Sequence, residues 1–317
     1  MRAGPLTIRM KQQATNRGGE APLLHLEVHL ISSSVMLGEP VVLCHRLTNT
    51  SGETLSVHMG RDQKDWITMR LGGPSGTPVP PRPDLRLRQG GIYSTGIRIS
   101  AESSATGYVV VSQRFLVSEV GDYELSLDVV APYEADFQAE KTSSHSEQPP
   151  AERTVLTESH AFPLTVTEAQ PARLRAVAEA LRESAAQAGS PERMMSLEAL
   201  FSMPEEYASD SWRAAAFDPR LLHSLSFIAD QLERLSTIVA AGILVEMVLN
   251  TSPDIIGKTL GDGATTAEKL PITLSFSVHR QFHNLYFHAD PALKAHLTKM
   301  YNDRGWAVPD RPIIIID

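Results

Sequence analysis

Hydrophobic residues occupy alternate positions over much of the chain between Leu24 and Val166. The segments with this pattern are LHLEVHL, VVLCHRL, WITMRL, DLRLR, YELSLDV and FPLTV. Alternation buries every second side chain, which is typical of half-buried β-strands. Clusters of Gly, Pro, Asn and Ser, such as LGEP, NTSG and GGPSG, separate these segments as turns do. Short strands joined by such turns predict a β-sandwich over residues 23–168.

After Pro171 the hydrophobic period changes to about 3.6 residues, the period of an amphipathic helix. The helical segments are ARLRAVAEALRESAAQA, MSLEALFSM, EEYASDSWRAAAF, RLLHSLSFIADQLERL, STIVAAGILVEMVLN, VHRQFHNLYF and PALKAHLTKMYND. Ser190 is predicted to cap the second of these helices, with Pro191 as its first residue. Short turns with Pro or Asp join the segments, so the pattern predicts antiparallel helix pairs over residues 169–310.

One part of the β-patterned region resembles bacterial immunoglobulin-like (Ig-like) modules. The resemblance depends on the turn at 38–41 (Gly-Glu-Pro-Val), an alternating strand and the corner at 48–51 (Thr-Asn-x-Ser). The motif at 121–123, Gly-x-Tyr, resembles the tyrosine corner that opens the penultimate strand of such folds. The resemblance implies that Leu43 and Leu125 stand where disulfide-bonded relatives carry cysteines. The predicted fold class is therefore an Ig-like sandwich followed by an all-α domain.

The same pattern is similar to that of the bacterial intracellular proteinase inhibitor domain. That similarity implies an exposed inhibitory loop, at 72–83 or at 132–157. In the helical part, SLEALFSMPEEY and LSFIADQLERLST recur at a separation of about 30 residues, which resembles HEAT-type repeats over 195–305. A plain helical bundle gives the same amphipathic pattern, so both interpretations stay open.

Three further segments lack either period. Residues 1–22 are polar and basic and are predicted to be a disordered arm, while polar 132–158 is predicted to be a mobile loop within the sandwich. The apolar tail 311–317 is expected to pack on its own chain, with strand addition to a partner or to the sandwich edge as the alternative. No signal-peptide pattern opens the chain, so a cytoplasmic location is expected, or an extracytoplasmic one if the start is misassigned.

Charge and composition exclude several classes of function. The chain of 317 residues carries 29 Lys and Arg against 37 Asp and Glu, a net charge of -8 that both halves share. Neither half is the polycation that a nucleic-acid backbone requires. No apolar run reaches the ~18 to 20 residues of a membrane helix. The single cysteine, Cys44, excludes an intrachain disulfide and a Cys-rich zinc site. No cofactor is expected.

Candidate chemistry is sparse. Cys44 is predicted to be a packed or half-exposed thiol, and His45 a hydrogen-bonded histidine of the core or rim. His279 and His283 are four residues apart, so they share a helix face and could chelate a metal. However, no Glu beside the first histidine supplies a base. The alternative is a pair of half-exposed helix histidines.

Three aromatic residues are candidates for binding. Trp66 is out of phase with the alternation that follows it, which predicts an outward position on its strand. Tyr207 and Trp212 lie on the second helix of a predicted pair. Exposed aromatic side chains favour interfaces, although burial between the domains is the alternative for both tryptophans. The sequence thus predicts a non-enzymatic interaction or scaffolding protein with a protein partner. The alternatives are a proteinase-inhibitor-like module and a metal-dependent hydrolase using His279 and His283.

Overall fold

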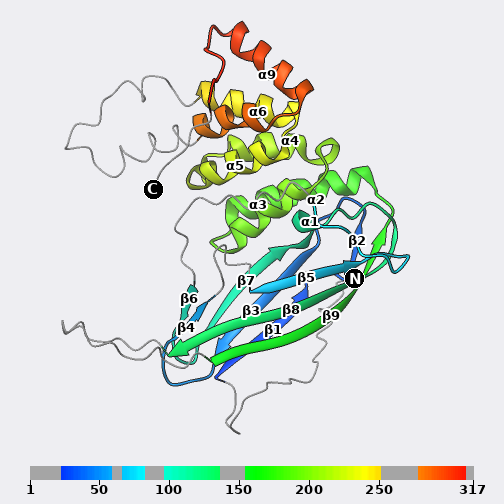
Figure 1. Cartoon of the computed structure of the whole chain (residues 1–317), viewed down its shortest axis with the longest axis vertical. Coiled ribbons are helices and arrows are strands. Elements are labelled where there is room, and N and C mark those ends of the chain that lie inside the picture. The colour runs from blue at the N-terminus through cyan, green and yellow to red at the C-terminus, as the bar shows by residue number, and fades with distance from the viewer. Residues whose placement is uncertain (1–22, 59–65, 83–95, 136–153, 251–277, 312–317) are drawn as a thin grey trace, which may run out of the picture. The chain divides into compact units, whose positions relative to one another are not determined.

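The chain divides into two compact units, residues 1–169 (the β unit) and 170–317 (the helical unit) (Figure 1). The computed structural model describes residues 23–58, 66–82, 96–135, 154–250 and 278–311. The expected β-rich N-terminal part and helical C-terminal part are both confirmed. The predicted arm at 1–22, the strand DLRLR and most of the apolar tail lie outside the described residues. Within the described residues, no helix combines the length and apolar character needed to cross a membrane.

Two sheets form the β unit (Figure 1). The strands are β1 (Leu24–Leu30), β2 (Ser34–Met36), β3 (Val42–Asn49), β4 (Leu55–His58), β5 (Ile67–Gly72), β6 (Gly96–Ile99), β7 (Ser104–Val110), β8 (Gly121–Ala135) and β9 (Thr154–Thr167). A short helix, α1 (Val111–Arg114), follows β7. One sheet has the order β1-β3-β7 and the other β2-β9-β8-β4-β6, with β5 also paired to β8. Both sheets contribute to one hydrophobic core, which makes the unit a β-sandwich.

The motifs that resemble Ig-like modules have clear roles. Leu43 and Leu125 are both fully buried in the core, so apolar packing occupies the two positions at which the resemblance implies cysteines in disulfide-bonded relatives. The Tyr123 hydroxyl donates to the backbone oxygen of Glu119 at 2.8 Å, at the start of β8. This hydrogen bond back to a residue just upstream defines a tyrosine corner. The predicted corner is therefore confirmed.

Asn49 explains the polar corner after β3. Its side chain is fully buried, and its amide nitrogen donates to the backbone oxygens of Glu53 at 2.7 Å and Ile99 at 3.0 Å. Its amide oxygen accepts from the backbone N–H of Ser51 at 2.9 Å. A buried amide with these partners satisfies backbone groups that the turn leaves unpaired. The corner is thus built around one side chain.

Several strands differ from the prediction. The alternation did not indicate β2, β6 or β7, because these strands are short or interrupted by glycine. The predicted loop 132–158 is wrong at both ends, since β8 continues to Ala135 and β9 begins at Thr154. Pro132 pairs with Val155 and Tyr133 with Thr154, so backbone pairing outweighs the polar composition there. Residues 136–153 lie outside the described part.

The helical unit follows the predicted segments. Its helices are α2 (Pro171–Gln187), α3 (Glu192–Ser202), α4 (Glu205–Ala216), η1 (Pro219–Ser224), α5 (Leu225–Leu235), α6 (Ile238–Asn250), a helix over 278–288 and α9 (Pro291–Asp303). Helix α2 packs against α3 and α4, α5 packs against α6, and α6 contacts α9. The predicted N-cap at Ser190 is wrong, because α3 begins at Glu192 and Pro191 takes the cap position without a side-chain hydrogen bond.

Candidate functional site

Trp66 does not present its ring to solvent. Its side chain is only 3% exposed and belongs to the hydrophobic core of the β unit. It packs edge-on against the His45 ring, with 5.0 Å between ring centroids. The predicted outward position is wrong because β5 starts at Ile67, so the strand alternation does not extend to Trp66. A buried indole offers a partner no contact surface.

Trp212 is also a core residue, within the helical unit. It is 1% exposed, stacks on Phe201 at 6.0 Å and donates its indole N–H to the backbone oxygen of Leu200 at 3.0 Å. Such a buried indole with its N–H satisfied is a packing element that joins α4 to α3. Tyr207, one turn earlier on α4, is half-buried. Neither residue lies in the pocket or along the strand edge considered below.

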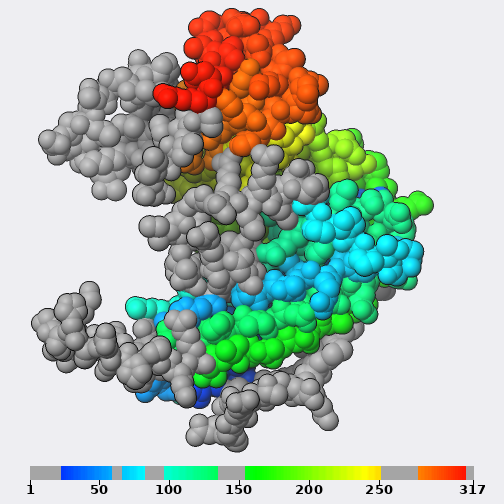
Figure 2. All heavy atoms as spheres, viewed as in Figure 1, coloured from blue at the N-terminus to red at the C-terminus, as the bar shows by residue number. Residues whose placement is uncertain are grey.

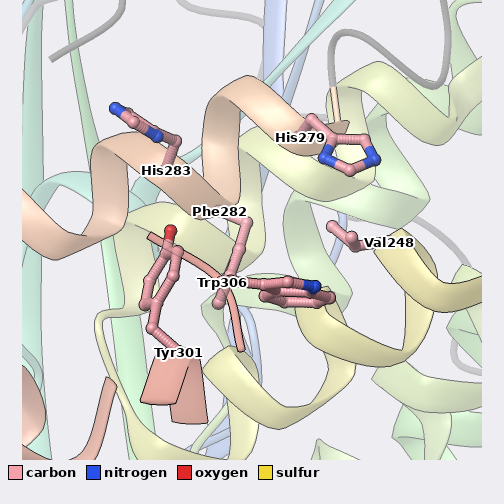
Figure 3. Close-up of a pocket in the computed structure, with 6 residues that line it drawn as sticks. All are labelled: Val248, His279, Phe282, His283, Tyr301 and Trp306. Atoms are coloured by element: carbon pink, nitrogen blue, oxygen red, sulfur yellow. The ribbon is translucent and has the colours of Figure 1, made fainter. Parts of the chain in front are cut away.

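His279 and His283 do not form a metal pair. Their imidazole rings point away from each other on the helix over 278–288 (Figure 3). The His283 Nε2–H donates to the backbone oxygen of Arg311 at 2.8 Å. Within the described ranges, no group of three or more His, Cys, Asp or Glu side chains could hold a metal ion. His279 and His283 have the four-residue spacing of one helix face, but their side chains do not point toward a common centre.

The two histidines instead border an apolar pocket of about 300 Å³, here called the aromatic pocket (Figure 3). Its lining residues are Val248, His279, Phe282, His283, Tyr301 and Trp306. They come from α6, the helix over 278–288, α9 and the turn after α9. Residues far apart in the sequence thus meet through helix packing, and three aromatic rings form most of the wall.

A helix-ending motif places Trp306. Gly305 has a φ of +67°, the left-handed conformation that ends many helices. The Trp306 N–H donates to the backbone oxygen of Tyr301 at 2.9 Å, and the Gly305 N–H donates to that of Asn302 at 3.0 Å. This is a Schellman motif, which brings the residue after the glycine onto the last helical turn. The Trp306 ring accordingly meets the Tyr301 ring edge-on at 6.1 Å.

Burial favours the neutral forms of His279 and Tyr301, two groups that line the pocket. It lowers the pKa of His279 and raises that of Tyr301, which the neighbouring Tyr286 raises further. Both shifts favour the neutral form because an apolar environment disfavours charge. The Arg304 guanidinium lies 5.7 Å from the centre of the Trp306 ring. No carboxylate is among the pocket's lining residues in the described part of the chain.

A second candidate lies along β9 in the β unit. The pairing of β8 with β9 is unbroken from Gly121 opposite Val166 to Tyr133 opposite Thr154. The Thr165 N–H donates to the backbone oxygen of Ser33 at 2.8 Å, so this N–H faces away from β8. Backbone groups of successive residues in a strand point in opposite directions, so every second residue counted back from Thr165 faces away from β8 as well. These residues are Val155, Thr157, Ser159 and Ala161. We call this row the β9 edge.

Described residues leave the β9 edge without a strand partner. Strand β2 pairs only with residues Thr165 to Thr167, at the far end of β9. The fourteen residues of β9 include no Lys or Arg, which commonly protect exposed edges. Pro163 bounds the row because it has no N–H. The Glu158 and His160 side chains contact each other at 3.0 Å on the opposite, inward side of the strand, so they do not line the outer face.

Apolar side chains border the β9 edge on the outer face of the sheet. Val130 on β8 lies opposite Thr157, and Pro132 lies opposite Val155. Val130 is 51% exposed and Val155 is 47% exposed. In Figure 2 the atoms of β9, in green, form a continuous band on the face shown. Among the described residues, the β9 edge therefore combines unpaired backbone groups with an apolar strip near Val155, while Asp128 on β8 lies opposite Ser159.

Sequence reasoning predicted neither the β9 edge nor an aromatic pocket, although it singled out His279 and His283, which border the pocket. It assigned the first part of β9 to a loop, although Leu156 and Phe162 hold the inward phase of the alternation. It also passed over Trp306, although a glycine directly after a helix followed by an aromatic residue is the Schellman signal. The edge itself depends on strand order, which no local pattern contains.

Comparisons with known proteins add little. No protein-family model matches the chain, and no curated protein matches it either. Similar solved structures include the PapD-like domain 7 of human CEP192, with a TM-score of 0.26, 13% identity, 51% of this chain covered and 99% of that chain. Another is a CARDB domain from Pyrococcus furiosus in complex with di-metal ions, with a TM-score of 0.21, 11% identity and coverages of 46% and 94%.

A third is Salmonella alpha-2-macroglobulin reacted with methylamine, with a TM-score of 0.25 and 10% identity. It is matched over 89% of this chain but only 21% of its own length. The first two are β-sandwich domains of Ig-like type. Neither the HEAT-type repeat nor the proteinase-inhibitor family is confirmed. Similarity this low carries no argument about function, so the strand order and contacts of this chain have to supply it.

Proposed function

We propose that this chain is a non-enzymatic interaction protein whose β unit binds an extended segment of a partner protein along the β9 edge. The observation that supports this proposal is the row of backbone groups from Val155 to Ala161, which no strand in the described residues pairs with. An added strand would satisfy these groups, as in other complexes formed by strand addition.

The side chains beside the edge indicate the kind of segment. Backbone pairing gives affinity in strand addition, while alternate side chains give specificity. Val130, Pro132 and Val155 would contact the side chains on one face of the added strand. We therefore expect a partner segment with small apolar residues at alternate positions. The acidic net charge of -8 also argues for a protein rather than a nucleic acid as the partner.

A matched pair of substitutions at Thr157 tests the proposal. Thr157→Pro removes one N–H from the β9 edge but none from the pairing with β8, and Pro163 shows that the strand accepts proline in this phase. Thr157→Val keeps the N–H. Tagged full-length chains would be purified from cells of the source organism and their partners identified by mass spectrometry.

We expect wild type and Thr157→Val to retain the same partners and Thr157→Pro to lose at least one of them. Circular dichroism and thermal unfolding must show that all three chains fold alike. Identical partners in all three chains, or none in any, would contradict binding through the β9 edge. If Thr157→Pro unfolds, a photo-crosslinking residue at position 157 replaces it, and crosslinks to a partner are the expected result.

A second candidate function, proteinase inhibition, is favoured by the order in the loop after β5. The Gly73 N–H donates to the backbone oxygen of Thr77 at 2.8 Å, and the Val79 N–H donates to the backbone oxygen of Leu71 at 2.7 Å. Gly76 has a φ of +74°, and the tip from Pro74 to Pro78 is exposed. A rigid exposed loop is what an inhibitor presents to a protease. A panel of serine, cysteine and metalloproteases showing no inhibition would eliminate this candidate.

A further inference from the structure

We propose that the aromatic pocket of the helical unit binds a planar two-ring aromatic compound that carries a hydrogen-bond acceptor. This site is separate from the β9 edge, and the inference does not depend on the proposed function. It rests on the pocket's size, its ring-lined wall and two polar groups at its rim.

Size sets the number of rings. The pocket volume is about 300 Å³. An apolar cavity of about 150 Å³ in another protein stays dry and takes up benzene. Roughly twice that volume accommodates two fused rings but not a large cofactor. Small-molecule sites of about 300 to 1,000 Å³ are the usual range, so this pocket lies at its lower end.

The wall of the pocket favours a flat aromatic occupant. Phe282 and Tyr301 stack with 5.2 Å between centroids, and the Phe282 and Trp306 rings meet edge-on at 6.1 Å. The Schellman motif fixes Trp306, so these rings are held in place before a ligand arrives. A flat ring gains stacking or edge-on contacts with such a wall beyond its area burial. A preformed wall also lowers the entropic cost of binding.

Two polar groups at the rim have no partner among the described residues. These are the imidazole of His279 and the indole N–H of Trp306. Figure 3 shows the indole nitrogen on the side of the ring where Val248 and His279 lie. A ligand acceptor placed there can take the indole N–H, and the neutral imidazole can donate a second hydrogen bond. The acceptor can be a carboxylate, because Arg304 lies against Trp306 and the described residues that line the pocket include no acid.

Isothermal titration of the full chain with three probes tests this inference. The probes are 2-naphthoate, naphthalene-2-carboxamide and cyclohexanecarboxylate. We expect saturable one-to-one binding of 2-naphthoate, similar or weaker binding of the carboxamide, and binding of the cyclohexane acid weaker by about tenfold or more because it lacks a flat ring. The carboxamide has a hydrogen-bond acceptor but no charge, so it shows whether binding requires the charge of the carboxylate or only an acceptor.

Three variants locate the binding. Val248→Phe fills the pocket and should weaken 2-naphthoate binding by about tenfold or more. His279→Leu should weaken it by about threefold to tenfold, the usual effect of one hydrogen bond. His296→Leu, on α9 but not among the lining residues, is the matched control and should bind like wild type. Thermal unfolding checks that each variant folds.

Tryptophan fluorescence gives a second measurement of binding, which does not require the Val248→Phe variant to fold. Trp66 and Trp212 are buried, whereas Trp306 borders the pocket. The emission of wild type should change on adding 2-naphthoate, and that of Trp306→Phe should not. The inference is overturned if no probe binds saturably, if all three bind equally, or if binding and emission changes persist in both Val248→Phe and Trp306→Phe.

Discussion

The β unit and the helical unit place their candidate sites by different means. The β9 edge exists because β9 lies next to β2, which pairs with only three of its residues. The aromatic pocket also needs long-range packing, because its lining residues come from three helices, but a local Schellman motif positions Trp306 in its wall. Strand order is a property of the whole sheet, whereas a helix cap is encoded within a few residues. The comparison teaches that the position of a free sheet edge depends wholly on strand order, whereas one part of the pocket wall is encoded locally at a helix end.

Core substitutions should give the largest changes in stability with which the β unit and the helical unit can be compared. Leu125→Ala in the β unit and Leu200→Ala in the helical unit each empty a fully buried position. Each should lower the free energy of unfolding by about 2 to 5 kcal/mol through lost burial and a cavity. If the units respond separately, hydrogen exchange should accelerate only in the unit that carries the substitution. Equal acceleration in both units from either variant would break the comparison.

His45 should make the β unit sensitive to acid. Burial lowers its pKa from 6.5 to about 4, and its Nδ1 has no hydrogen-bond partner in the described residues. The neighbours Val28, Gly107 and Trp66 carry no charge. Between these pKa values the unfolded chain binds the proton and the folded chain does not. Stability is therefore full above pH 6.5 and should fall by about 3 kcal/mol as the pH drops to 4.

Denaturant unfolding of the β unit between pH 7 and 4 measures this dependence. His45→Leu removes the titrating group and should flatten the profile relative to wild type. His296→Leu, in the helical unit, is the control and should keep the wild-type profile for the β unit. A His45→Leu profile as steep as that of wild type would show that other groups cause the acid sensitivity.

Local patterns predicted much of the fold and little of the sites. Alternation identified β1, β3, β5 and the centre of β8, and the 3.6-residue period identified every helix of the helical unit that the structure describes. The pattern failed at β7, where Gly107 interrupts it. A side chain there would clash, since a Cβ atom would lie 2.4 Å from the His45 ring. The need for that glycine arises between strands and is invisible along the chain.

Trp66 shows why the candidate binding residues were misjudged. Its outward position was inferred by extending strand phase one residue before the strand begins. Trp212 fits the buried side of α4, but the amphipathic pattern alone does not say which aromatic side chains reach solvent. Exposure depends on packing between helices, here on Phe201 and the Leu200 carbonyl. The tyrosine corner was predictable because its hydrogen bond spans only four residues.

Single side-chain hydrogen bonds, one buried in the helical unit and one part-buried in the β unit, should have smaller effects. Trp212→Phe leaves the buried Leu200 oxygen without its donor and should cost about 1 to 3 kcal/mol. Tyr123→Phe removes the bond to Glu119, an exposed residue whose oxygen can bind water instead, and should cost about 1 kcal/mol. Thermal or denaturant unfolding of both variants measures the difference. A larger loss for Tyr123→Phe would mean that the corner does more than satisfy one carbonyl.

Exposed ion pairs should give the smallest effect and no difference between the units. Arg70 contacts Asp128 at 2.6 Å across β5 and β8, and Arg213 contacts Glu246 between α4 and α6. At least one side chain of each pair is half-exposed or more, so solvent screens the attraction. Double-mutant cycles with alanine should give coupling below about 1 kcal/mol for both, decreasing as salt is raised. A salt-insensitive coupling of several kcal/mol in only one unit would contradict this expectation. It would mean that surface charge stabilises that unit in addition to its backbone pairing or helix packing.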